Sequence, residues 1–261
     1  MGLVTAEMHG ATSYPDRWAL TSAPISAVPD DVINDLVAAT TTLRRCAQTR
    51  RALRGASSTF PASLLRIEPV AEWMRKRGIG IDVRTPDDFI DFARSGVAAK
   101  YATVHCHSDD TTVTRAGRSG IRRLVVSAPR DVDALTRHDS MPWQVIVDAT
   151  DIDRLATVAQ YLAEPGHEMI GVRCNLAGHD DREIARHLRD VVGTLAAMRR
   201  RSGTIVCRIL LDHYGPLSHH RPPAEVRWHA HLLEDLVEQA CARHRYPRPA
   251  LVVPLSRSVF D

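Results

Sequence analysis

The sequence predicts an α/β protein folded as one (β/α)8 TIM-type barrel. Eight short apolar segments recur along the chain, and segments with the apolar spacing of helices lie between them. This alternation favours a parallel sheet surrounded by helices. The length of 261 residues is ordinary for such a barrel as a single domain. An open doubly wound sheet is the alternative, but the sequence lacks the glycine-rich phosphate turn that usually follows one of its early strands.

The barrel domain is predicted to span residues 23–261, after a loosely ordered tail of residues 1–22 that lacks periodicity. Ile25–Val28 has the pattern of a short strand, and Asp30 and Asp31 are favourable near the start of the helix that follows. The predicted barrel strands are Thr59–Leu65, Ile79–Val83, Ala102–Cys106, Ile121–Val126, Trp143–Val147, Met169–Arg173, Thr204–Leu211 and Ala250–Val253. The predicted helices between them are Glu68–Lys76, Pro86–Arg94, Thr111–Arg118, Arg130–Arg137, Ile152–Ala163, Asp181–Arg200 and Ala224–His244.

The composition is that of an ordinary globular protein, with 44% hydrophobic and 25% charged residues. The net charge of +3 comes from interspersed residues of both signs, so we expect no nucleic-acid binding. No stretch approaches eighteen consecutive apolar residues and the N-terminus has no signal pattern, so we expect no membrane association. The five cysteines are widely spaced, which fits a reducing compartment and predicts a cytoplasmic protein.

Several segments of the chain carry a resemblance to a known family. Phe60–Leu65, Pro69–Trp73 and Gly80–Val83 resemble the opening barrel strand, first helix and second strand of the fold-type III pyridoxal-phosphate decarboxylases. The diaminopimelate and ornithine decarboxylases and the alanine racemase-like barrels belong to this group. Further similar segments are Thr103–His105, Gly120–Val126, Arg189–Gly193 and Pro247–Val253. The resemblance implies a barrel that binds pyridoxal phosphate and a C-terminal β-domain that completes the active site across a dimer. The 261 residues end just after the last similar strand, so we expect that β-domain to be absent.

The resemblance also identifies the positions that hold the cofactor in the family. An ungapped match backwards from Asp82 places Ser63 where the family has its Schiff-base lysine, and a serine cannot form an imine. The family's glycine-rich phosphate loop corresponds to a stretch that begins with Asp212, and its stacking histidine corresponds to Asn175. Its acid beside the pyridine nitrogen is replaced by Pro254, although Arg257 is retained. Asp82 and His105 match polar positions of the family.

The substitutions lead to a prediction about function. The chain has only two lysines, Lys76 and Lys100, and neither follows a predicted strand, so both are expected away from the barrel mouth. We therefore expect no pyridoxal phosphate and a degenerate, non-catalytic barrel that serves in binding or regulation. Its expected partner is a second copy of the chain or a paralogous enzyme, because an uncovered apolar surface is unfavourable in water.

An enzyme with altered chemistry is the alternative. His105, His107 and Asp109 begin at the end of a predicted strand, and residues two apart on a strand face the same side, so a zinc site for metal-assisted hydrolysis is possible there. Residual pyridoxal-phosphate chemistry would need another amine, and weak phosphate binding through Arg257 without catalysis is a third hypothesis. Further polar residues that follow predicted strands are His179, Asp180, Asp212, His213, His219 and His220.

Overall fold

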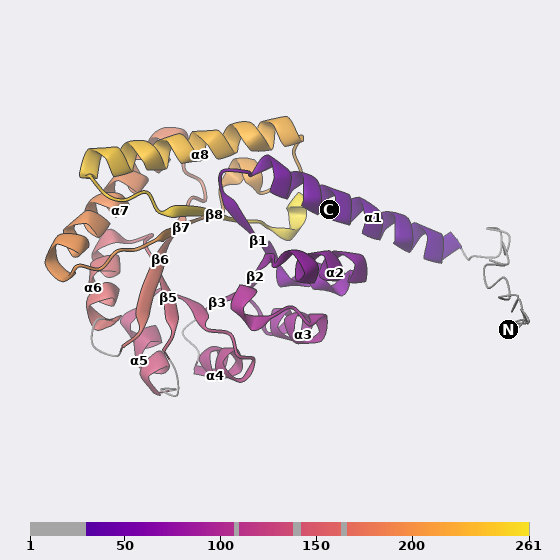
Figure 1. Ribbon diagram of the computed structural model, residues 1–261, viewed down its shortest axis with the longest axis horizontal. Helices are drawn as coiled ribbons and strands as arrows, with labels where there is room; N and C mark the ends of the chain where they lie inside the picture. Colours follow the sequence, from indigo (N-terminus) through magenta and orange to yellow (C-terminus); the bar gives the residue numbers. More distant parts are fainter. Residues whose placement is uncertain (1–29, 107–109, 138–141, 163–165, 261) are drawn as a thin grey trace, which may run out of the picture. The chain divides into compact units, whose positions relative to one another are not determined.

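The computed structural model describes residues 30–106, 110–137, 142–162 and 166–260 of the chain. Eight parallel strands pair in sequence order and close into a barrel, because β1 pairs both with β2 and with β8 (Figure 1). The predicted (β/α)8 barrel is thus confirmed. The strands are β1 (Ser57–Pro61), β2 (Gly80–Val83), β3 (Ala102–His105), β4 (Arg123–Val126), β5 (Gln144–Asp148), β6 (Glu168–Asn175), β7 (Arg208–Asp212) and β8 (Ala250–Pro254).

Helices connect successive strands. They are α2 (Glu68–Arg77), α3 (Pro86–Ser95), α4 (Asp110–Arg118), α5 (Pro129–Arg137), α6 (Ile152–Leu162), α7 (Asp181–Ser202) and α8 (Pro223–His244), preceded by α1 (Asp30–Ala52). Short 3-10 helices are η2 (Ala62–Arg66), η3 (Ala99–Tyr101), η4 (Gly215–Leu217) and η5 (Arg257–Val259). The chain divides into two compact units, residues 1–37 and 38–261, and the second contains the whole barrel. The predicted tail and the predicted strand Ile25–Val28 lie outside the described residues.

The predicted first strand is wrong in its second half. Strand pairing stops at Pro61, which lacks the N–H needed to continue a ladder of hydrogen bonds. The chain then turns into η2, which buries Ala62, Leu64 and Leu65. Ser63 therefore lies in a turn beyond the strand and not at its end. The seventh strand also begins later than predicted, at Arg208.

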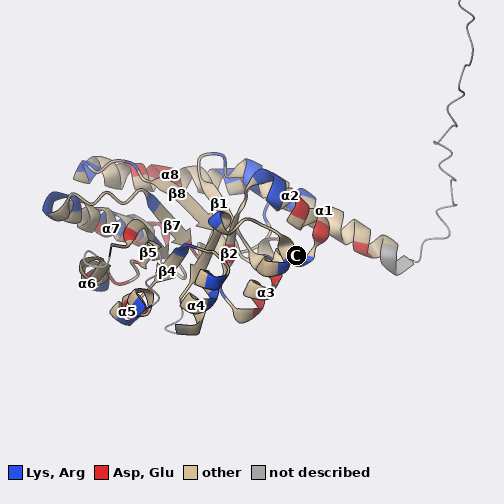
Figure 2. Cartoon of the chain, turned by 60° about the horizontal axis from the view of Figure 1, so that its bottom comes forward, with Lys and Arg blue, Asp and Glu red and all other residues tan. Residues whose placement is uncertain are grey.

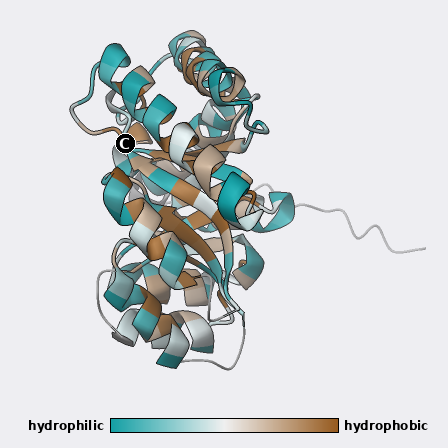
Figure 3. Ribbon diagram, turned by 90° about the vertical axis from the view of Figure 1, so that its left-hand side faces the viewer, coloured by the Kyte–Doolittle hydropathy of each residue, from teal (hydrophilic) through white to brown (hydrophobic). Residues whose placement is uncertain are grey.

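Apolar side chains fill two separate spaces on either side of the sheet. The larger core lies between the strands and the helices, and its biggest fully buried side chains include Trp143, Phe60 and Phe260. Phe60 and Phe260 stack with their ring centroids 5.3 Å apart. The barrel interior holds a small cluster of Val125, Ile146, Ile170, Leu210 and Val252, in which Val125 pairs with Ile146 and Leu210 with Val252 across neighbouring strands. Figure 3 shows brown strands against helices that are largely teal on their outer faces.

Local signals fix the helix ends that set the strand positions. Thr85 and Asp88 form a capping box at the start of α3, and Asp180 and Glu183 form one at α7. At the end of α2, Gly78 adopts a φ of 58°, and a Cβ there would lie 2.7 Å from the Tyr101 ring. None of the helices in the described ranges combines the length and the apolar content needed to cross a membrane.

Candidate functional site at the C-terminal mouth of the barrel

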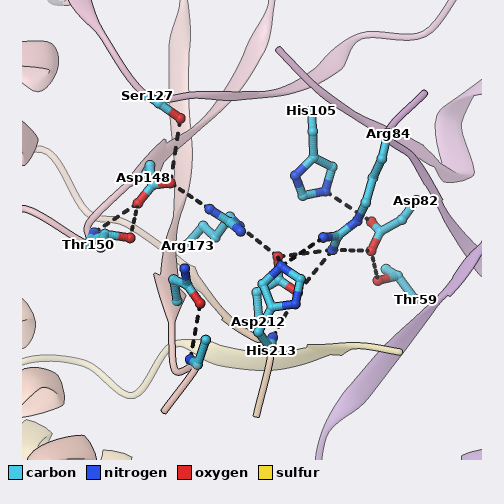
Figure 4. A network of polar contacts seen from close by, with 12 residues as sticks. Thr59, Asp82, Arg84, His105, Ser127, Asp148, Thr150, Arg173, Asp212 and His213 are labelled. Atoms are coloured by element: carbon cyan, nitrogen blue, oxygen red, sulfur yellow. Dashed lines mark hydrogen bonds and ion pairs between the residues drawn. The ribbon is translucent and has the colours of Figure 1, made fainter. Parts of the chain in front are cut away.

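Polar side chains gather where the barrel strands end. All eight strands are parallel, so their C-terminal ends meet at one rim, which is where TIM-barrel active sites lie. Figure 4 shows polar side chains from several of these strands converging on one another. The residues labelled there within strands are Thr59, Asp82, His105, Asp148, Arg173 and Asp212, joined by Arg84, Ser127, Thr150 and His213 from the loops that follow strands.

Arg84 and Arg173 tie the strand ends together. Nη2 of Arg84 lies 3.0 Å from both carboxylate oxygens of Asp212 and 3.3 Å from Oδ2 of Asp82. Arg173 donates from Nε to Asp212 at 2.7 Å and from Nη1 to Asp148 at 2.6 Å. The order Asp82–Arg84–Asp212–Arg173–Asp148 therefore alternates in charge across the mouth. We call these five residues the mouth network.

The mouth network is largely removed from water, and its charges are held by one another. The side chain of Asp82 is 1% exposed and that of Asp212 is 3% exposed. Burial alone would raise the pKa of Asp212, but the guanidinium groups of Arg84 and Arg173 lower it to about 2. Burial likewise opposes ionisation of Asp82, yet His105 and Arg84 hold its pKa below the usual value. Both carboxylates are therefore ionised at neutral pH, and each is paired.

His105 and Thr59 contact Asp82 from the neighbouring strands. The hydroxyl of Thr59 donates a buried hydrogen bond of 3.0 Å to Oδ2 of Asp82. Nε2 of His105 lies 3.6 Å from Oδ1 of Asp82, which is beyond hydrogen-bonding distance. Burial lowers the pKa of His105 and outweighs the opposing effect of Asp82.

The structure describes only one of the three residues predicted to hold a metal. His105 lies at the mouth, whereas His107 and Asp109 fall outside the described residues. Within the described ranges, no three His, Cys, Asp or Glu side chains are arranged to hold a metal ion. The other polar residues serve separate local roles or face solvent. Asp180 caps α7, His179 stacks on His187 with centroids 6.1 Å apart, and the His213 Nε2 lies 3.3 Å from Nη1 of Arg84.

The remaining positions that the resemblance singled out lie around the mouth, and Asp212, Pro254 and Arg257 line one cleft there. The carbonyl oxygen of Ser63 accepts a 3.3 Å hydrogen bond from Nη1 of Arg257. Oδ1 of Asn175 accepts from the backbone N–H of Ala177 at 3.1 Å, so this side chain stabilises its own turn. A cleft of about 240 Å³ lies between the ends of β7 and β8, and Arg84, Asp212, Pro254 and Arg257 are among the residues that line it.

Neither lysine lies at the mouth. Nζ of Lys76 contacts Oε1 of Glu72 at 2.6 Å on the exposed side of α2. Lys100 belongs to η3, which precedes β3 and so lies at the opposite end of the barrel. The mouth residues consequently do not fit pyridoxal phosphate. No lysine amine lies there to form the imine, and the buried carboxylate of Asp212 would repel a phosphate group.

The sequence identified Asp82, His105 and Asp212 as polar mouth positions but missed their partners. Arg84, Asp148 and Arg173 were not singled out, and neither was the supporting hydroxyl of Thr59. A signal for two of them was present. Arg173 ends an apolar predicted strand and Asp148 directly follows one, and charged residues at these places point to the C-terminal mouth of a parallel barrel.

Solved structures with a similar backbone arrangement include lysine, ornithine and arginine decarboxylases. The lysine/ornithine decarboxylase from Vibrio vulnificus, complexed with putrescine, aligns with a TM-score of 0.70 and 10% identity, covering 85% of this chain and 62% of that chain. Ornithine decarboxylase from Entamoeba histolytica aligns with a TM-score of 0.65 and 11% identity, covering 85% and 64%. The arginine decarboxylase from Paramecium bursaria Chlorella virus, bound to agmatine, gives 0.65 and 10%, also covering 85% and 64%.

These similarities define the fold class of the chain. It has the barrel of the fold-type III decarboxylases, as the resemblance in its sequence implied. The chain spans about three fifths of the length of the first decarboxylases it matches. No family model matches the sequence, and no curated protein matches it in sequence. The likeness in backbone is therefore a likeness of fold.

Proposed function

We propose that this chain is a non-catalytic relative of the decarboxylases, whose barrel serves in binding or regulation. The proposal rests above all on the mouth network. Arg84 and Arg173 are cations at the rim where the cofactor phosphate would need donors, but their hydrogen bonds go to Asp82, Asp212 and Asp148. Releasing Arg84 for a ligand would leave the buried carboxylate of Asp82 without its guanidinium partner.

The free energy needed to release a guanidinium opposes ligand binding at the mouth. Breaking a buried ion pair by removing one partner costs about 3–5 kcal/mol, because the remaining charge is left without compensation. A phosphate ligand would also meet the negative charge of Asp212. The replacement of the lysine by Ser63 adds a chemical reason, since no imine can hold the cofactor in place. These two features are independent and support the same conclusion.

Titration with pyridoxal phosphate tests the proposal. The purified chain is scanned from the near ultraviolet to the visible, then reduced with borohydride and analysed by mass spectrometry. We expect no saturable imine band and no stoichiometric adduct. Any low-level modification should be shared between Lys76 and Lys100, as is typical of exposed lysines. A saturable band with one adduct on a single lysine, lost when that lysine is replaced by glutamine, would show a working cofactor site and refute the proposal.

The proposed binding function requires a protein partner. We propose that the barrel pairs with a second copy or with a paralogous decarboxylase. Sedimentation velocity of the full chain over a range of concentrations distinguishes a self-associating protein from a monomer. A monomer at every concentration would remove the homodimer and leave co-purification with a paralogous decarboxylase as the decisive measurement.

A further inference from the structure

A large cavity lies at the end of the barrel opposite to the mouth network. Its volume is about 1030 Å³. The first residues of five strands line it, namely Ser57, Gly80, Arg123, Arg208 and Ala250. The cavity is therefore the N-terminal mouth of the barrel. The active sites of TIM-barrel enzymes lie at the other, C-terminal mouth. The C-terminal half of α1 lies along one of its sides, through Ala47, Arg50 and Arg51.

The described residues that line this cavity include seven cations and no acid. Arg50, Arg51 and Arg54 come from α1 and the turn that follows it; Figure 2 shows the arginines near the end of this helix in blue. Arg77 and Lys100 come from α2 and η3. The remaining two, Arg123 and Arg208, begin β4 and β7 and so lie at the base of the cavity. This concentration of one sign is unusual in a chain whose overall net charge is only +3.

Arg123 and Arg208 differ from the arginines at the other mouth. Nε of Arg123 is buried and has no hydrogen-bond partner. Burial and the nearby Arg208 lower the pKa of Arg123, against the weaker pull of Asp82. Two guanidinium groups that repel each other in a partly buried place are unfavourable in the folded protein unless an anion compensates them. At the opposite mouth, three carboxylates supply that compensation.

We propose that this cavity binds a compact polyanion, a small molecule that carries several linked phosphoryl groups. Guanidinium groups form paired hydrogen bonds with phosphate oxygens, and the preponderance of arginine suits this chemistry. Two arginines at the base and five cations around them match several phosphoryl groups better than a single one. The inference concerns the opposite end of the barrel from the mouth network, so it does not depend on whether that network excludes catalysis.

Calorimetric titration of the full chain with sodium tripolyphosphate at low ionic strength tests the inference. We expect saturable binding of one molecule per chain, weakening as salt is added. Arg123→Gln and Arg208→Gln should each weaken binding about tenfold, the loss expected for a charge-assisted pair of hydrogen bonds. Arg227→Gln is the matched control, because it removes one exposed charge from α8 outside the cavity, and it should bind as the unaltered chain does.

Further variants and ligands keep the test decisive. Arg51→Gln alters an exposed residue of α1 at the cavity, so it reports on binding even if a barrel variant fails to fold. ATP without magnesium is titrated in parallel. Tighter binding of ATP would assign the site to a nucleoside triphosphate, and equal binding would assign it to the phosphate chain alone. No saturable heat with either compound, or equal weakening by Arg227→Gln, would overturn the inference.

Discussion

Arg84 joins Asp212 across the barrel mouth, with its Nη2 3.0 Å from both carboxylate oxygens. The two residues follow and end strands β2 and β7, and 128 positions of sequence separate them. Arg173 approaches the same carboxylate from β6 at 2.7 Å. One buried acid is therefore held by two guanidinium groups from different strands, and the chain's stability and its response to pH should both depend on this arrangement.

Replacing Arg173 tests how much the mouth network contributes to stability. Arg173→Met removes the hydrogen bonds to both Asp148 and Asp212, and so leaves one half-buried and one buried carboxylate short of a partner. We expect the free energy of unfolding to fall by about 3 kcal/mol. Urea unfolding followed by circular dichroism measures it. Arg227→Met on the exposed surface of α8 should change stability by less than about 0.5 kcal/mol, and equal losses in the two variants would contradict the prediction.

Acid should destabilise the chain through Asp212. The folded-state pKa of about 2 lies below the ordinary value of 3.8, so the stabilisation is complete above the ordinary value and is lost as the pH falls towards 2. The pairing contributes about 2 kcal/mol at neutral pH. In Asp212→Asn the unfolding free energy should be lower at neutral pH, and its difference from the unaltered chain should narrow between about pH 4 and pH 2. A constant difference across this range would contradict the assignment, and exposed Asp235→Asn is the control.

The hydroxyl of Thr59 should support the network through Asp82. Thr59→Val keeps the shape of the side chain but removes the 3.0 Å donor to a buried carboxylate. We expect a loss of about 1–3 kcal/mol, measured by thermal and urea unfolding. Thr157 donates a comparable bond on the exposed surface of α6, so Thr157→Val should have a much smaller effect. Similar losses at the two sites would mean that the buried carboxylate does not depend on this donor.

Arg123 should be unfavourable for folding when no anion is bound. Its buried Nε lacks a hydrogen-bond partner, and Arg208 adds repulsion. Arg123→Met should therefore raise the unfolding free energy by about 1 kcal/mol in buffer without phosphate. Tripolyphosphate should raise the melting temperature of the unaltered chain and raise that of the variant much less, since only binding to the folded state stabilises it. A variant that is less stable without anion would show that Arg123 already has compensation in the folded chain.

Much of the fold could be predicted from the sequence because it depends on local patterns. The alternation of short apolar segments with helical spacing gave all eight strands and their parallel order. The prediction failed at Ala62–Leu65, where a strand was expected and the chain forms most of the 3-10 helix η2. A run of Phe, Pro, Ala and Leu is apolar in either conformation, and only the end of pairing at Pro61 decides between them.

The candidate site could be predicted only in part. Asp82 and His105 were identified because the resemblance matched them to polar positions, and Asp212 because it directly follows a predicted strand. Their partners Arg84 and Arg173 were missed, because nothing in the neighbouring sequence tells which acid a guanidinium will reach. Of the three residues predicted to bind a metal, only His105 lies within the described residues. His107 and Asp109 lie outside them, so the predicted metal site stays untested.

The sequence by itself determined the alternation of strands and helices that forms the barrel, and the scarcity of amines, since Lys76 and Lys100 are the only lysines. These follow from hydrophobic periodicity and from residue identity, which need no long-range contact. The tertiary structure alone decided that Arg84 and Arg173 find carboxylates at one mouth, whereas Arg123 and Arg208 meet no acid lining the cavity at the other, among the residues described. Closing the barrel places side chains from distant strands side by side, and only there do their charges compensate or repel one another.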